Sequence, residues 1–90
     1  MAAMKEITRT QTGVRIETRL LKVLKAVATE LNMSLGDLIE GIVLHAFEGK
    51  APFSPKMRKQ IAALKAAYGL DLTAKDSHKL QESGDERRRG

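Results

Sequence analysis

A chain of 90 residues is long enough for one domain, and it contains no cysteine, which excludes disulfides and thiolate metal sites. Its net charge of +5 and pI of about 9.8 suit a polyanionic partner, and no apolar run approaches the ~20 residues that a membrane span requires. A chain this short buries too little apolar surface for a secure core, so we expect oligomerisation to complete it. These features predict a cytoplasmic protein with no cofactor, no bound metal and no membrane attachment.

The charge is arranged in blocks along the chain. Residues 1–25 carry a net charge of +4, residues 26–54 carry −3 and residues 55–70 carry +4. Residues 71–90 contain equal numbers of basic and acidic side chains. A basic start, an acidic middle and a second basic block indicate a polarised molecule, which favours a polyanion on one side.

Residues 1–9 show no periodic pattern and are predicted to be a flexible basic arm. Residues 10–16 then alternate with period two, with Thr10, Thr12, Val14 and Ile16 on one side and Gln11, Gly13 and Arg15 on the other. This alternation and its β-branched residues predict an extended strand. Because no second strand pattern follows, we expect the strand to pair antiparallel with the same strand of another copy, across a twofold axis.

After the strand pattern, the period changes to that of a helix. The apolar stripe of this first helix contains Leu20, Val23, Leu24, Val27, Ala28 and Leu31. Thr18 is the predicted N-cap. Asn32 is the predicted stop, since asparagine tolerates the left-handed backbone conformation.

A second helix is predicted to begin at Ser34, which stands three residues before Asp37 as in a capping box. Its apolar stripe contains Leu35, Leu38, Ile39, Ile42, Val43, Ala46 and Phe47, and Gly49 ends it. We expect this stripe to form the core and the dimer interface.

A third helix is predicted from Ser54, as N-cap, and Pro55, as first helical residue, to Gly69. Its apolar stripe contains Met57, Ile61, Leu64 and Tyr68. Residues 50–70 are therefore interpreted as a linker and third helix. Residues 71–90 are interpreted as a disordered charged tail.

Residues 11–43 resemble the ribbon-helix-helix module of the Arc, MetJ and CopG repressors. The resemblance lies in R-I-E-T-R-L-L at 15–21 and in L-N-M-S-L-G-D-L-I at 31–39. The segment L-H-A-F-E-G at 44–49 is similar to the end of the second helix in methionine repressors. The resemblance implies a mainly α ribbon-helix-helix homodimer in residues 10–49, with an additional C-terminal helix.

In that family, two paired strands fill the DNA major groove. Carried over to this chain, the resemblance assigns base contacts to Gln11, Gly13 and Arg15. It assigns phosphate contacts to Ser34, Leu35 and Gly36, at a helix N-terminus. Arg9 and Arg19 are expected, as basic residues near the strand, to add phosphate contacts that read no sequence. Two positions depart from the family pattern: Gly13 has no side chain to read a base, and Glu17 places a negative charge where the family often has proline.

These observations lead us to expect a dimeric, sequence-specific binder of double-stranded DNA, a transcriptional repressor whose dimers assemble further on adjacent half-sites. No phosphate-binding loop, metal-binding pattern or nucleophile with a nearby base is present, so an enzyme is not expected. Two alternatives remain open. One is an antitoxin or a plasmid maintenance or transfer factor that binds a protein partner through residues 55–70. The other is a dimeric protein-interaction module without DNA binding.

Overall fold

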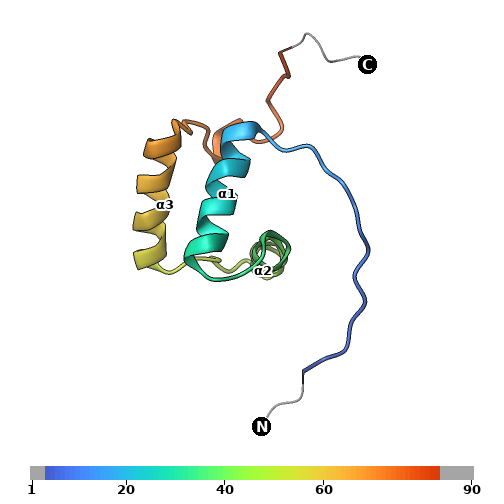
Figure 1. Cartoon of the computed structure of the whole chain (residues 1–90). Helices are drawn as coiled ribbons and strands as arrows, with labels where there is room; N and C mark the ends of the chain where they lie inside the picture. The colour runs from blue at the N-terminus through green and yellow to red at the C-terminus, as the bar shows by residue number, and fades with distance from the viewer. Residues whose placement is uncertain (1–3, 84–90) are drawn as a thin grey trace.

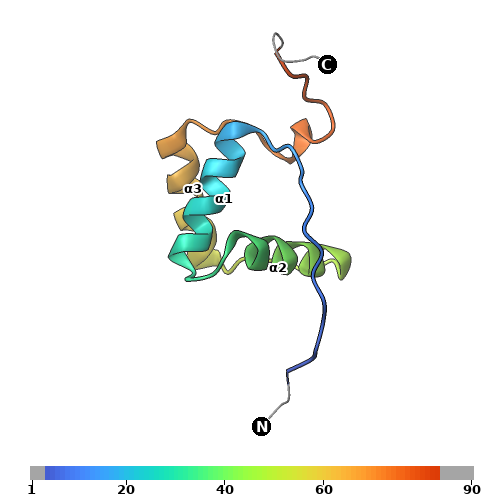
Figure 2. The ribbon, with the colours of Figure 1, turned by 45° about the vertical axis from the view of Figure 1, so that its right-hand side comes forward.

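The computed structural model describes residues 4–83, and its helices form a small two-layer body with an extended N-terminal segment. The elements are α1 (Thr18–Glu30), α2 (Leu35–Phe47), α3 (Pro55–Tyr68) and a short 3-10 helix, η1 (Ala74–Asp76). Helices α1 and α3 lie side by side and run in opposite directions, and α2 crosses near the end of α1 (Figure 1). Figure 2 shows α2 along its length, pointing away from the other two helices. Within residues 4–83, none of these helices has the length and hydrophobicity needed to cross a membrane.

The predicted ribbon-helix-helix fold is wrong, because the described residues contain no β-strand. Residues 4–16 follow an extended path but make no backbone hydrogen bond within the described part of the chain. Alternation with period two reports only which side of an extended chain each residue occupies. A strand also needs a neighbour for its N–H and C=O groups, and within residues 4–83 no other segment forms backbone hydrogen bonds with this one. The mainly helical class agrees with the structure.

The helix ends follow the local signals in the sequence closely. The Ser34 and Ser54 hydroxyls each accept a hydrogen bond, at 3.1 Å, from the backbone N–H three residues later, and Pro55 is the first residue of α3. Asn32 after α1 adopts a φ of 56° and Gly69 after α3 a φ of 67°, as their predicted roles as helix stops require. These predictions are confirmed because a cap depends on residues only a few positions apart.

The core lies between α1 and its two neighbours and is small. Within the described residues, its buried members are Val23, Val27, Ala28, Leu38, Met57 and Leu70. Each helix contributes to this set, and Leu70 comes from the chain after α3. In α3, Met57 is buried and Ile61 and Leu64 are partly buried against the core, so the apolar stripe of this helix is used mainly in packing on α1.

The chain after α3 turns back toward the start of α1. Leu70 is buried and Leu72 packs against the core, and η1 is capped by Thr73, whose backbone N–H donates to Asp76 at 2.8 Å. Leu72 and η1 belong to residues 71–90, which were interpreted from the sequence as a disordered charged tail. Its last part, residues 84–90, lies outside the described residues, as do residues 1–3 of the predicted arm.

The fold leaves much of its apolar surface open to solvent. On α2, Val43 is 39% exposed, Leu44 62% and Phe47 81%. Of the predicted α2 stripe, Leu38 is buried and Ile42 packs, partly buried, against the core, so these two residues meet the core part of that prediction. Val43, Ala46 and Phe47 are exposed and are free to meet another molecule.

Candidate nucleic-acid interface

The N-terminal segment, residues 4–17, runs from the start of α1 past α2 as an extended chain (Figure 2). Residues 4–15 are all exposed, and they include every predicted base-contact residue. No neighbouring side chain packs on Gly13, since a Cβ built there would meet no atom within 4 Å. The segment is therefore an accessible arm on which Gln11 and Arg15 can approach another molecule without any change in the helical body.

Arg9 joins this arm to the first half of α2. Its Nε donates to Glu40 Oε2 at 2.9 Å and its Nη2 to Glu40 Oε1 at 3.0 Å, while Asp37 lies 3.7 Å away. The hydrogen bond from Arg9, with its positive charge, lowers the pKa of Glu40 below its ordinary value. The two-pronged contact places Arg9 close to the start of α2, where the other predicted phosphate-contact residues lie.

Ser34, Leu35 and Gly36 form the N-terminal end of α2. The Ser34 hydroxyl accepts from the backbone N–H of Asp37, so one free donor of the first turn is already satisfied. Ser34 and Gly36 are exposed, and Leu35 is partly buried. The remaining backbone N–H groups of this turn can still hold an anion, but Asp37 adds a negative charge beside them.

The junction between the arm and α1 is built around Glu17. Its carboxylate accepts a hydrogen bond from the Leu20 backbone N–H at 2.8 Å, which makes Glu17, and not Thr18 as predicted, the N-cap of α1. That hydrogen bond lowers the pKa of Glu17. Sequence reasoning treated Glu17 only as an unwelcome charge near DNA. The signal it missed is that an acidic side chain three residues before a helical N–H can serve as a cap.

Arg19 lies at the same junction and is held by three partners. It donates to Glu17 Oε2 at 3.1 Å, to the Gly69 carbonyl oxygen at 2.8 Å and to Asp71 Oδ1 at 3.2 Å. The hydrogen bond to Glu17 and the charge of that carboxylate raise the pKa of Arg19. Arg19 therefore ties the start of α1 to the end of α3, a structural role that its prediction as a phosphate contact did not include.

Arg15, the predicted base reader, points to the C-terminal segment. Its Nη2 lies 2.6 Å from Glu82 Oε1, and both side chains stay exposed, at 78% and 65%. Arg9, Arg15 and Arg19 are thus each paired with a carboxylate inside the chain. The structure brings Arg9 near the start of α2 and holds Arg15 and Arg19 at the other end of the arm, near the C-terminal segment.

The basic side chains of α1 and α3 differ from Arg9, Arg15 and Arg19 in their pairing. Lys22, Lys25, Lys56, Arg58 and Lys59 are exposed, and none of them forms an ion pair with another residue in the 4–83 range. They add positive potential to the helical body without specific geometry. Such charges attract a polyanion from a distance but read no sequence.

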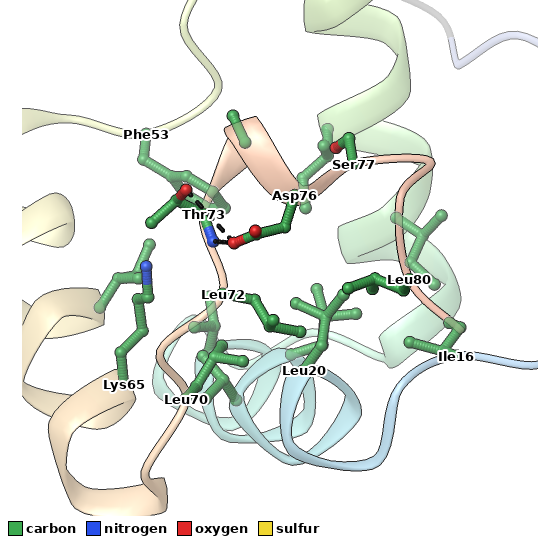
Figure 3. A pocket seen from close by; sticks show the side chains of 17 residues that line it. Ile16, Leu20, Phe53, Lys65, Leu70, Leu72, Thr73, Asp76, Ser77 and Leu80 are labelled. Carbon is green, nitrogen blue, oxygen red and sulfur yellow. Dashed lines mark hydrogen bonds between the residues drawn. The ribbon is translucent and has the colours of Figure 1, made fainter. Parts of the chain in front are cut away.

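An apolar cavity of about 580 Å³ opens between α1, α2 and the C-terminal segment. Ile16 and Leu20, just before and within the start of α1, line it together with Leu72 and Leu80 of the C-terminal segment (Figure 3). Ile39 and Ile42 of α2 form another wall. Its lining is mostly aliphatic and contains no arrangement of catalytic side chains, so it suits an apolar surface of another molecule better than a polar substrate.

Comparison of the chain with models of protein families, with curated proteins and with solved structures finds no match.

Proposed function

We propose that this protein is a homodimeric DNA-binding protein that regulates transcription. The observation that carries the proposal is the exposed N-terminal arm, which presents Arg15 and Gln11 on an extended backbone beside a small helical body. An arginine can make two hydrogen bonds to guanine, and a glutamine two to adenine. In this proposal the arm lies along a DNA groove and needs no pairing with a second strand.

Phosphate contacts from Arg9, Arg19 and the start of α2 would position the arm. Both arginines are engaged with carboxylates in the free chain, so DNA has to compete for them. Duplex DNA carries about one charge per 1.7 Å of helix axis, a far higher density than two or three isolated carboxylates provide. The net charge of +5 favours the same partner.

Dimerisation is the second part of the proposal. It is supported by the small core, by the open apolar cavity and by the exposed Leu44 and Phe47 on α2. Contact between two copies across these surfaces would remove apolar area from water, which is the main favourable term in association. A dimer would also present two arms to neighbouring half-sites on DNA.

The test is titration of a fluorescent duplex with the full chain, followed by anisotropy over a series of salt concentrations. We expect the logarithm of the binding constant to fall linearly with the logarithm of salt, by about 0.9 per phosphate neutralised. Arg15→Ala should weaken binding to the preferred duplex by about 1–3 kcal/mol. Lys50→Ala makes the same charge change at a residue paired with Glu48, away from the arm, and should have little effect.

The preferred duplex is identified by selecting bound sequences from random DNA. Recovery of a defined site supports sequence-specific regulation. Binding without any sequence preference would support the phosphate contacts and contradict base reading by Gln11 and Arg15. Absence of duplex binding at low salt contradicts the proposal.

The exposed apolar residues of α2 also favour one rival, a dimeric protein-interaction module without DNA binding. It predicts a dimer in solution and no change in duplex anisotropy. The adaptor alternative is an antitoxin or plasmid factor that binds a partner through residues 55–70. It has less support, because the apolar stripe of α3 that suggested it packs on α1, apart from Tyr68, which is 43% exposed.

A further inference from the structure

The C-terminal segment, residues 70–83, returns to the arm and lies against its last residues. The residues of the two segments line a common surface hollow, formed by residues 15–18 on one side and residues 80–83 on the other. The segment is anchored in the core at its start, where Leu70 is 7% exposed. Further along, Leu80 is 55% exposed, so the hold on the segment weakens toward its end.

The path of the segment is directed by a turn just before Leu80. The Lys79 backbone N–H donates to the Asp76 carbonyl oxygen at 3.0 Å, and His78 adopts a left-handed φ of 66°. This turn follows η1 and sends the chain toward the arm. The beginning of the segment is thus fixed on the helices, while its end reaches the arm through side chains alone.

At that end, the carboxylate of Glu82 accepts a hydrogen bond from the guanidinium of Arg15. The Nη2 atom that lies 2.6 Å from Glu82 Oε1 belongs to the group that would donate to a base or a phosphate. Arg15 is the residue to which the proposed function gives base reading. Glu82 and a DNA acceptor therefore compete for the same donors.

We propose that the C-terminal segment is an internal competitor of DNA, in which Glu82 holds Arg15 until a duplex displaces it. This inference rests on the proposed function, because it describes the regulation of the same arm. The ion pair between Glu82 and Arg15 is weak enough for DNA to displace it. Both partners are largely exposed, so water and salt weaken their attraction, and the segment can leave from its loosely held end without disturbing Leu70.

The first experiment measures duplex affinity of Glu82→Gln, which keeps the shape of the side chain and removes its charge. Exposed ion pairs contribute little, so we expect binding to tighten by about 1.5-fold to 5-fold. Glu48→Gln makes the same change in net charge at a site paired with Lys50 and is the matched control. An equal gain in both variants would show that only net charge matters and would overturn the proposal.

A double-mutant cycle ties the effect to one pair of residues. If Glu82 acts by holding Arg15, Glu82→Gln should bring no gain in a chain that already carries Arg15→Ala. A gain of the same size in both backgrounds means that Glu82 acts on DNA directly or through another residue, and the proposal fails. In that case duplex binding by the wild-type chain still supports the proposed function.

The second experiment does not depend on affinity. The chain has no cysteine, so Ser83→Cys gives a single site for a nitroxide spin label. The label should broaden the NMR signals of residues 14–18 in the free protein, and added duplex should restore them. No broadening in the free protein, or broadening that persists in the complex, overturns the inference. If neither the wild type nor Glu82→Gln binds a duplex, the proposed function fails and the inference fails with it.

Discussion

Glu17 and Arg19 form one unit at the start of α1: the carboxylate that caps the helix also receives the guanidinium of Arg19 at 3.1 Å. Through Arg19 this cap is connected to the Gly69 carbonyl oxygen, so the first turn of α1 is joined to the end of α3. The arm therefore leaves the helical body from a fixed point. Arg15 lies two residues before Glu17, so the direction in which its side chain leaves the body depends on this junction.

Removing the cap should destabilise the fold. Glu17→Ala leaves the Leu20 N–H without its acceptor and removes one of the three partners of Arg19, so we expect the melting temperature to fall by a few degrees in a circular dichroism scan. Thr18→Ala is the control, since the Thr18 side chain is exposed and does not cap the helix. Equal losses in the two variants would contradict the assignment of Glu17 as the N-cap.

The same carboxylates should make stability depend on pH in acid. The pKa values of Glu17 and Glu40 are lowered from an ordinary 4.5, so each group stabilises the folded state while it is ionised. This stabilisation is fully present above the ordinary pKa and is lost as the pH falls through the lowered values in the folded chain. Melting temperatures measured from about pH 6 to about pH 3 should therefore drop mainly below the ordinary value. A chain carrying Glu17→Gln and Glu40→Gln should show a smaller drop, and an unchanged profile would contradict these two pKa shifts.

Leu38 is the buried residue that α2 contributes to the core. It is 4% exposed, so Leu38→Ala removes buried methyl groups and leaves a cavity, at a cost of about 2–5 kcal/mol in the free energy of unfolding. Urea unfolding measures this cost. Leu80→Ala makes the same chemical change at a residue that is 55% exposed and should cost much less. A small cost for Leu38→Ala would mean that α2 is not held by the core as described.

Two glycines of α2 separate helix stability from phosphate binding. A Cβ at Gly36 would meet only the Ser34 Oγ, at 4.0 Å, and a Cβ at Gly41 would meet no atom within 4 Å. Gly41→Ala, in the helix interior, should raise the free energy of unfolding by about 0.5–1 kcal/mol, because alanine is the better helix former, and Gly36→Ala, in the first turn, should raise it by less. Only Gly36→Ala should also weaken duplex binding, since its methyl group stands where a phosphate would approach. Unchanged DNA affinity in Gly36→Ala removes the start of α2 from the proposed interface.

The exposed end of α2 is the place to test dimerisation. Phe47 is 81% exposed, and Phe47→Asp puts a charge into the apolar surface that a second copy would cover. Light scattering after gel filtration at micromolar concentration should report a dimer for the wild type and a monomer for this variant. Tyr68→Asp, at an exposed aromatic on α3, should remain dimeric. A wild-type monomer would contradict the dimeric part of the proposed function.

The sequence by itself determined the helices and most of their ends. Ser34, Ser54 and Gly69 act where they were expected because helix caps use hydrogen bonds between residues three or four positions apart. Apolar spacing also identified most of the residues of α1 and α3 that face inward, although Leu20, Leu31 and Tyr68 of the predicted stripes are exposed. The extended course of residues 10–16 was readable in the same way, whereas its pairing was not, because pairing requires a second segment that alternation alone does not identify.

Only the tertiary structure decided what these elements contact. Arg15 meets Glu82 across 67 positions and Arg19 meets Asp71 across 52, and neither pairing leaves a mark in local spacing. Residues 70–83 return toward α1 because Leu70 is buried and Leu72 packs against the core. The local sequence does not predict this return, because these two leucines stand in a mostly polar segment without apolar periodicity. Hydrogen bonds between residues a few positions apart determine where a helix starts and stops. Burial and ion pairing between residues far apart in the sequence depend on the whole fold, and they determine which face of each helix remains exposed to solvent.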